Sequence, residues 1–157
     1  DVAVRSLVAL GRLPHRDRGT AQVESAIAAL DLNELADRPV SRLSGGERAR
    51  VLLARVLAGE PKWILADEPL AALDLAHQLA LLRHLRTAAE AGAGVVLVLH
   101  DLALAMNHAD RVIVLSGGTK AADGAPEEAL SADVIQRVWG VPARWLGEPG
   151  ARALVAG

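Results

Sequence analysis

Leu43-Ser44-Gly45-Gly46-Glu47 is the stretch from which the rest of this chain can be interpreted. Ser44 is a preferred residue for capping a helix N-terminus, so we expect an amphipathic helix to begin here and to run to about residue 57. The first turn of a helix has backbone N–H groups without acceptors, and glycine lets an anion approach them closely. The stretch predicts a phosphate-binding helix end, with a glycine loop before an ordinary capped helix as the simpler alternative.

Two adjacent carboxylates, Asp67 and Glu68, follow an apolar run at residues 63–66. The run predicts a short buried strand with the two acids at its carboxyl end. Neighbouring strand residues point to opposite sides, so one acid could hold Mg²⁺ through water while the other faces an attacking water. A solvated turn is the alternative. His100 ends a second apolar run, residues 95–99, where a neutral imidazole could meet the same phosphate.

These motifs, taken in order, resemble the nucleotide-binding domain of ABC transporters. The signature Leu-Ser-Gly-Gly-Glu comes first, and the apolar strand ending in Asp67 and Glu68 follows it. Ala-Ala-Leu-Asp at residues 71–74 then matches the D-loop, and His100 matches the switch histidine. Four motifs in one order at similar spacings make the resemblance specific.

The resemblance covers roughly residues 1–146 and implies an α/β fold, the C-terminal part of a P-loop NTPase with a largely parallel sheet flanked by helices. Alternating strand and helix patterns after Pro61 favour the same class. We expect a partial helical signature subdomain at residues 1–58, a partial RecA-like catalytic subdomain at 59–146, and a tail at 147–157.

The resemblance also implies ATP and Mg²⁺ as cofactors and gives each motif a role. Asp67 would hold Mg²⁺ through water, Glu68 would polarise the attacking water or accept its proton, and His100 would contact the γ-phosphate. Asp74 would organise the interface between two subunits. The signature residues would bind the γ-phosphate held by the partner subunit; they are Ser44, Gly45, Gly46 and Glu47.

Two departures from the family pattern stand out. Ala71 occupies a D-loop position where the family often has serine, which removes a hydrogen bond across the dimer. A P-loop needs Gly-Lys before Ser or Thr, and the two lysines, Lys62 and Lys120, follow a proline and a threonine. We therefore expect the sequence to be the C-terminal part of a longer protein. A family member that has lost its P-loop is the alternative.

The segment Gly11-Arg12-Leu13-Pro14-His15 resembles the branch of the family that serves importers of iron-siderophores, haem and cobalamin. The branch implies a second copy of the subunit and transmembrane permease subunits as partners, with a substrate-binding protein as an indirect one. It implies a peripheral position at the cytoplasmic face of the membrane. A soluble ABC ATPase acting on DNA or ribosomes and a non-catalytic interaction module are the rival interpretations.

Composition supports a folded domain and argues against some partners. The 157 residues are 52% hydrophobic, with three tryptophans, no other aromatic residue and no cysteine. A net charge of −2 with scattered arginines gives no reason to expect nucleic acid as a partner. The absence of cysteine excludes disulfides and thiolate metal sites, and no apolar run reaches the roughly 18 residues that a membrane helix needs.

The remaining patterns predict further elements. A helix over residues 1–10 should end at Gly11, and Thr20 should cap a second helix. A hairpin should turn at residues 116–118, and helices should start at Pro126 and after Ser131. Residues 148–157 should lack regular structure. A helix capped by Asp74 should end before Gly92; its expected inward residues are Leu75, Leu79, Leu82 and Leu85, and its expected surface residues are His77 and His84.

Overall fold

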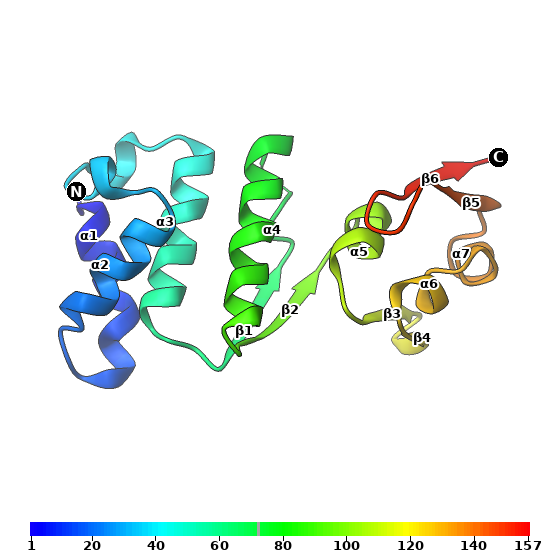
Figure 1. The fold of residues 1–157 in the computed structure, drawn as a ribbon, viewed down its shortest axis with the longest axis horizontal. Helices are drawn as coiled ribbons and strands as arrows, with labels where there is room; N and C mark the ends of the chain where they lie inside the picture. Colours follow the sequence, from blue (N-terminus) through cyan, green and yellow to red (C-terminus); the bar gives the residue numbers. More distant parts are fainter. Residues whose placement is uncertain (72) are drawn as a thin grey trace. The chain divides into compact units, whose positions relative to one another are not determined.

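The computed structural model describes residues 1–71 and 73–157 of the chain. They form two compact units, Asp1–Val98 and Leu99–Gly157 (Figure 1). The parallel strand pair lies in the first unit and two antiparallel hairpins lie in the second. In the described residues no helix is long and apolar enough to cross a membrane.

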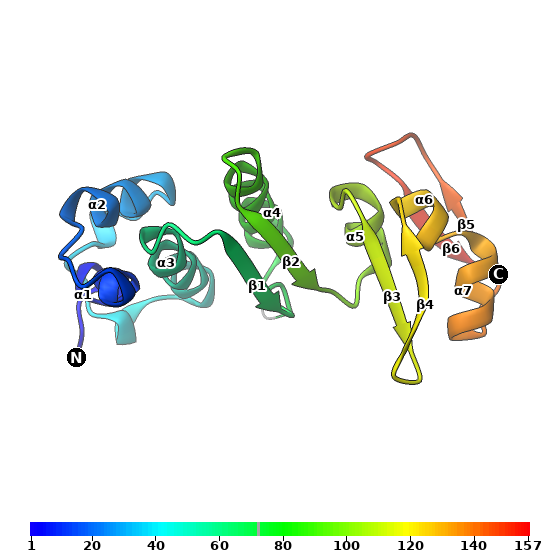
Figure 2. The same cartoon turned by 90° about the horizontal axis from the view of Figure 1, so that it is seen from below.

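Three packed helices make up the first part of unit one (Figures 1 and 2). They are α1 (Val4–Ala9), α2 (Thr20–Ala29) and α3 (Gly45–Ala58), with 3₁₀ turns at η1 (Leu10–His15), η2 (Asn33–Leu35) and η3 (Val40–Arg42). Their apolar faces meet in a core whose largest fully buried side chains are Val4, Val8, Ile27, Leu30, Leu32 and Val51. The burial of these faces removes apolar surface from water and stabilises the bundle.

Two expectations for these helices are wrong in detail. Gly11 does not end the first helix, because the chain continues through it as η1. This is possible because a Cβ at Gly11 would lie 2.0 Å from the carbonyl oxygen of Arg55, so only glycine allows η1 this close to α3. Thr20 is the first residue of α2, and Gly19, with a φ of 46°, occupies the cap position without a side-chain bond.

The second part of unit one is a strand–helix–strand crossover. Strand β1 (Trp63–Asp67) pairs in parallel with β2 (Gly94–Val98), and α4 (Leu75–Glu90) connects them and packs on β2 (Figure 2). The pair confirms the expected α/β pattern, since parallel strands need such a crossover. Gly92, with a φ of 101°, follows the end of α4 as expected.

Burial in this part differs from the expectation of a fully buried strand. Ile64 is buried, whereas Trp63 and Leu65 are 67% and 75% exposed, so α4 covers one face of the strands only. On α4, Leu82 and Leu85 are buried as expected, but Leu75 and Leu79 are exposed. All four share one helical stripe, and only the C-terminal half of that stripe is covered.

Unit two builds its own small core. Its elements are α5 (Leu102–His108), β3 (Val112–Ser116), β4 (Thr119–Gly124), α6 (Pro126–Ala129), α7 (Ala132–Trp139), β5 (Ala143–Leu146) and β6 (Ala153–Ala156). The expected β3–β4 hairpin turns through Gly117 and Gly118, which have φ values of 56° and 76°. The core consists of Met106, Val114, Leu130 and Val134.

The expectation that residues 148–157 lack regular structure is wrong, because β6 pairs with β5 in an antiparallel hairpin. Asn107 fixes this hairpin through two bonds: its amide nitrogen donates to the Arg152 carbonyl, and its oxygen accepts from the Arg152 N–H, both at 2.8 Å. The indole N–H of Trp145 donates to the Leu130 carbonyl at 2.7 Å. No local sequence pattern predicts these bonds, because they join residues that are far apart in the chain.

Candidate phosphate and carboxylate site

The N-terminus of α3 has the predicted cap. The N–H of Glu47 donates to the Ser44 hydroxyl at 3.2 Å, and the Glu47 carboxylate accepts from the Ser44 N–H at 2.7 Å. This reciprocal capping box satisfies two backbone donors within the chain. Since the N–H of Arg48 already donates to the Ser44 carbonyl, the N–H groups of Gly45 and Gly46 remain as the donors without an intrahelical acceptor.

The charges at this helix end oppose each other. The backbone hydrogen bond from Ser44 holds the pKa of Glu47 below its usual value, so the capping residue is an anion at neutral pH. Arg38 approaches the same carboxylate at 3.7 Å and partly offsets its charge. An incoming anion is therefore attracted by backbone amides more than by side-chain charge. Glu47 acts on the helix cap, and its predicted contact with a nucleotide stays a prediction.

Gly45 and Gly46 have different surroundings. Gly45 is exposed, and no other part of the chain occupies the place where a Cβ there would sit. A Cβ at Gly46 would lie 2.2 Å from Cδ2 of His77, because the imidazole of α4 rests on the glycine. The contact between the two helices thus requires glycine at position 46, and binding of a phosphate there stays a prediction.

Sequence reasoning missed His77. Its Nδ1 lies 2.7 Å from Oδ1 of Asp74, and its backbone N–H donates to the same oxygen at 3.0 Å. These bonds hold the pKa of Asp74 below its usual value, with the backbone bond as the largest cause. Asp74 caps α4 as expected and also orients the ring toward the signature glycine. The spacing of an N-cap acid and a histidine three residues later was the available signal.

Asp67 and Glu68 are both exposed at the carboxyl end of β1. Asp67 is the last strand residue, paired with Val98 in the register. Glu68 has a φ of 46° and its N–H donates to the Val98 carbonyl at 3.1 Å. The expectation that strand alternation separates the two acids is therefore wrong, since Glu68 leaves the strand in a left-handed turn. That conformation is uncommon for a residue other than glycine and accompanies functional sites.

The loop after Glu68 is tied to α4. The amide of Gln78 donates to the carbonyls of Leu70 and Leu73, at 3.2 and 3.1 Å. Ala71 N–H donates to the Glu68 carbonyl at 3.2 Å, and Ala72 lies outside the described residues. These bonds tie Leu70 and Leu73 to α4 and Ala71 to Glu68.

His100 lies in the second unit, exposed, immediately before the cap of α5. The neighbouring Asp101 accepts from the N–H groups of Ala103 and Leu104, at 2.8 and 3.0 Å, and so fixes where α5 begins. The contact of His100 with a γ-phosphate stays a prediction.

The described residues offer one carboxylate for Mg²⁺ and one helix end for a phosphate. Across residues 1–71 and 73–157, no three His, Cys, Asp or Glu side chains gather closely enough to hold a metal ion. Mg²⁺ at nucleotide sites is bound by one or two carboxylates together with waters and phosphate oxygens, so one exposed carboxylate is sufficient. Asp67 meets that requirement, and the open backbone at Gly45 meets the requirement of a phosphate.

Comparison with known proteins shows the family to which the chain is similar. The sequence model of the ABC transporter family matches residues 5–71. The hemin import ATP-binding protein HmuV of Rhodococcus jostii is 47% identical over 150 residues, 92% of this chain and 51% of the relative. HmuV of Streptomyces coelicolor is 46% identical over 158 residues, 98% of this chain and 56% of the relative. The chain spans about half the length of these curated relatives.

Solved structures show the same fold. A metal-chelate type ABC transporter in an inward-facing conformation aligns with 99% of this chain and 66% of its own, at 27% identity and a TM-score of 0.87. CbiO1 of Clostridium perfringens, part of the ABC transporter complex cbiONQ, aligns with 87% of this chain and 56% of its own, at 28% identity and a TM-score of 0.73.

The fold thus defines a protein of the α/β class. The chain belongs to the ABC transporter family. The resemblance inferred from its four motifs is confirmed.

Proposed function

We propose that the protein carrying this chain is the ATP-hydrolysing subunit of an importer for haem or a related metal chelate. The observation that carries the proposal is the capped Ser44 helix end, with two glycine donors that lack an intrahelical acceptor, in one unit with the Asp67 and Glu68 carboxylates. Relatives at 46–47% identity are named for hemin import, which supports the substrate class.

The residues divide the chemistry between them. Mg²⁺-bound ATP supplies the phosphoryl group and the charge that phosphoryl transfer requires. Asp67 binds the metal through water, and Glu68 orients the attacking water and accepts its proton. His100 binds the γ-phosphate. The signature donors of Gly45 and Gly46 bind the γ-phosphate held by a second subunit, and Asp74 orders the loop at that interface.

The assembly follows from this division. Two copies of the subunit form a head-to-tail dimer, because each contributes the signature to the nucleotide of the other. The dimer binds transmembrane permease subunits at the cytoplasmic face of the membrane, and a substrate-binding protein delivers the chelate. The name of the cbiONQ complex, which contains a structural neighbour, supports such a multi-subunit assembly.

Glu68→Gln in the full-length protein tests the proposal. The amide keeps the shape of the side chain and loses the ability to accept a proton, so we expect MgATP binding to persist while turnover falls by about 10²-fold or more. Binding is measured by calorimetry and hydrolysis in a single turnover. Hydrolysis at the wild-type rate in this variant would remove Glu68 from the mechanism.

A further inference from the structure

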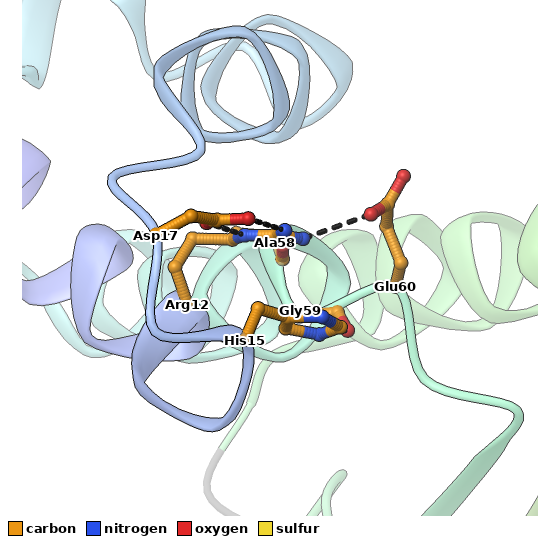
Figure 3. Close-up of polar contacts among 6 residues, drawn as sticks. All are labelled: Arg12, His15, Asp17, Ala58, Gly59 and Glu60. Atoms are coloured by element: carbon orange, nitrogen blue, oxygen red, sulfur yellow. Dashed lines mark hydrogen bonds and ion pairs between the residues drawn. The ribbon is translucent and has the colours of Figure 1, made fainter.

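Arg12 is a buried charged side chain, only 4% exposed, in the 3₁₀ turn η1. Its Nε and Nη2 donate to the two oxygens of Asp17 at 2.9 and 2.7 Å, and its Nη1 donates to Glu60 at 2.8 Å (Figure 3). The guanidinium lowers the pKa of Asp17, and the two carboxylates raise the pKa of Arg12. A buried charge persists when it is paired in this way.

The same segment caps the far end of the signature helix. Nη1 of Arg12 donates to the carbonyl of Ala58, the last residue of α3, at 3.1 Å. Nε2 of His15 lies 2.8 Å from the carbonyl oxygen of Gly59 (Figure 3). The final carbonyls of a helix lack intrahelical donors and carry a partial negative charge, so a guanidinium there is favourable.

The backbones of η1 and the C-terminal end of α3 are closely packed. Gly11 touches the Arg55 carbonyl, and a Cβ at Gly59 would lie 3.0 Å from the Gly11 carbonyl oxygen. Glu60 has a φ of 47°, a conformation that residues other than glycine rarely adopt. The ion pair with Arg12 thus holds Glu60 in a sharp turn directly after α3.

This turn is the covalent link between the helix that carries the signature and the strand that carries Asp67, which the proposed dimer places in two composite sites. Four residues, 59–62, separate α3 from β1. The signature lies at the start of α3, and Asp67 ends β1. A 14-residue helix is about 21 Å long, so a rotation of about 3° at its C-terminus moves its N-terminus by about 1 Å. A misplacement of about 1 Å at a reacting group can cost roughly 10²-fold in rate.

We propose that Arg12 is a positioning residue for ATP hydrolysis, because it fixes the angle between α3 and β1. Arg12 touches no reacting atom. It acts through Glu60 and the Ala58 carbonyl, which set where the signature helix end lies relative to the strand that carries Asp67. The proposal rests on the proposed ATPase function and adds a residue to it.

Three single variants of the full-length protein test this role. Glu60→Asn tolerates the positive φ but is one methylene too short to reach Arg12, so it opens the junction without straining the backbone. Glu60→Gln keeps the length and an acceptor oxygen, and serves as the rescue. Asp17→Asn weakens the pair of Arg12 on the η1 side while leaving Glu60 and Ala58 in place, and serves as the matched control.

We expect Glu60→Asn to lower kcat at least about tenfold, with KM for ATP changed less than about threefold and the melting temperature nearly kept. Glu60→Gln should retain most of the turnover. Asp17→Asn should lower the melting temperature on the order of a few °C and keep kcat. Steady-state hydrolysis and thermal unfolding are measured for every protein.

Two results would overturn the positioning role while leaving the proposed ATPase function in place. Wild-type kcat in Glu60→Asn would show that the junction does not position the site. A kcat that simply follows the melting temperature across the three variants would show a role in stability alone. Failure of the wild type itself to hydrolyse ATP would overturn the proposed function, and this inference with it. That outcome is distinguishable from the two above, because both of them require an active wild type.

Discussion

At the scale of single residues, local chemistry explains what could be predicted. Ser44 and Asp74 are helix caps in the structure as in the sequence, because a cap depends on one side chain and the next three backbone N–H groups. Arg12 and His77 have partners 46 and 31 residues away, at Ala58 and Gly46, and sequence periodicity carries no record of such contacts. The left-handed turn at Glu68 was likewise not predictable from its apolar strand.

His84 gives a prediction about pH. His84 was expected at the surface and is half-buried there, and burial lowers its pKa below the ordinary value of 6.5, with Asp31 acting in the opposite direction. The unfolded chain then binds the proton more readily than the folded chain, so the contribution of His84 to stability is fully present above pH 6.5 and is lost as the pH falls through the lowered pKa of the folded state.

We expect the urea midpoint of the wild type to fall between about pH 7.5 and 5.5, and His84→Gln to reduce that fall. The two denaturation series share every other titrating group, so their difference reports His84. Parallel curves for the two proteins would contradict the assignment.

At the scale of elements, the period of apolar residues predicts whether a segment is a helix or a strand. It does not predict which of the apolar faces are buried. The leucines of α4 from Leu75 to Leu85 lie on one face of the helix, as the sequence predicts. The first half of that face is nevertheless exposed, because burial depends on which other parts of the fold pack against it. Residues 148–157 have short strands whose order depends on Asn107 and Trp145 instead of on a pattern of their own.

The contact between α3 and α4 predicts that Gly46→Ala changes stability in opposite directions with and without the His77 ring. Gly46→Ala should destabilise the protein, because the new Cβ would meet a His77 ring that its bond to Asp74 prevents from moving aside. In a His77→Ala background the same change should stabilise it by up to about 1 kcal/mol, since alanine is the better helix former.

Urea denaturation of the four proteins in this cycle measures the coupling. The reversal is expected only if the ring occupies the space over Gly46. An equal effect of Gly46→Ala in both backgrounds would show that the ring does not restrict the glycine.

At the scale of the whole molecule, the chain lacks the Gly-Lys-Ser/Thr sequence whose backbone and lysine cradle the phosphates of a nucleotide. The signature amides of α3 and the carboxylates of β1 offer charge and donors without that cradle. We therefore expect the 157-residue chain alone to bind MgATP weakly. Calorimetry with the isolated chain measures this, and a micromolar dissociation constant would contradict it.

The central claim is that the signature of one subunit completes the site of the other. A defect in the signature and a defect in the carboxylates can then be placed in different subunits of one dimer. Ser44→Arg fills the donor end of α3, and Glu68→Gln disables the carboxylate end of β1, so each homodimer should be inactive. In a mixed dimer both defects fall in one composite site and the other site is whole.

The most direct measurement is therefore ATP hydrolysis by an equimolar mixture of full-length Ser44→Arg and Glu68→Gln subunits after exchange. We predict recovery of up to about a quarter of wild-type turnover, because half of the dimers are mixed and each has one intact site. The control mixes the wild type with the Ser44→Arg/Glu68→Gln double variant, whose mixed dimers have one defect in each site. Its turnover should therefore fall on exchange from about half of the wild-type value to the quarter that remaining wild-type homodimers supply, whereas turnover of the test mixture should rise from near zero. A mixture as inactive as either homodimer, or a Ser44→Arg homodimer that hydrolyses ATP normally, would contradict the account.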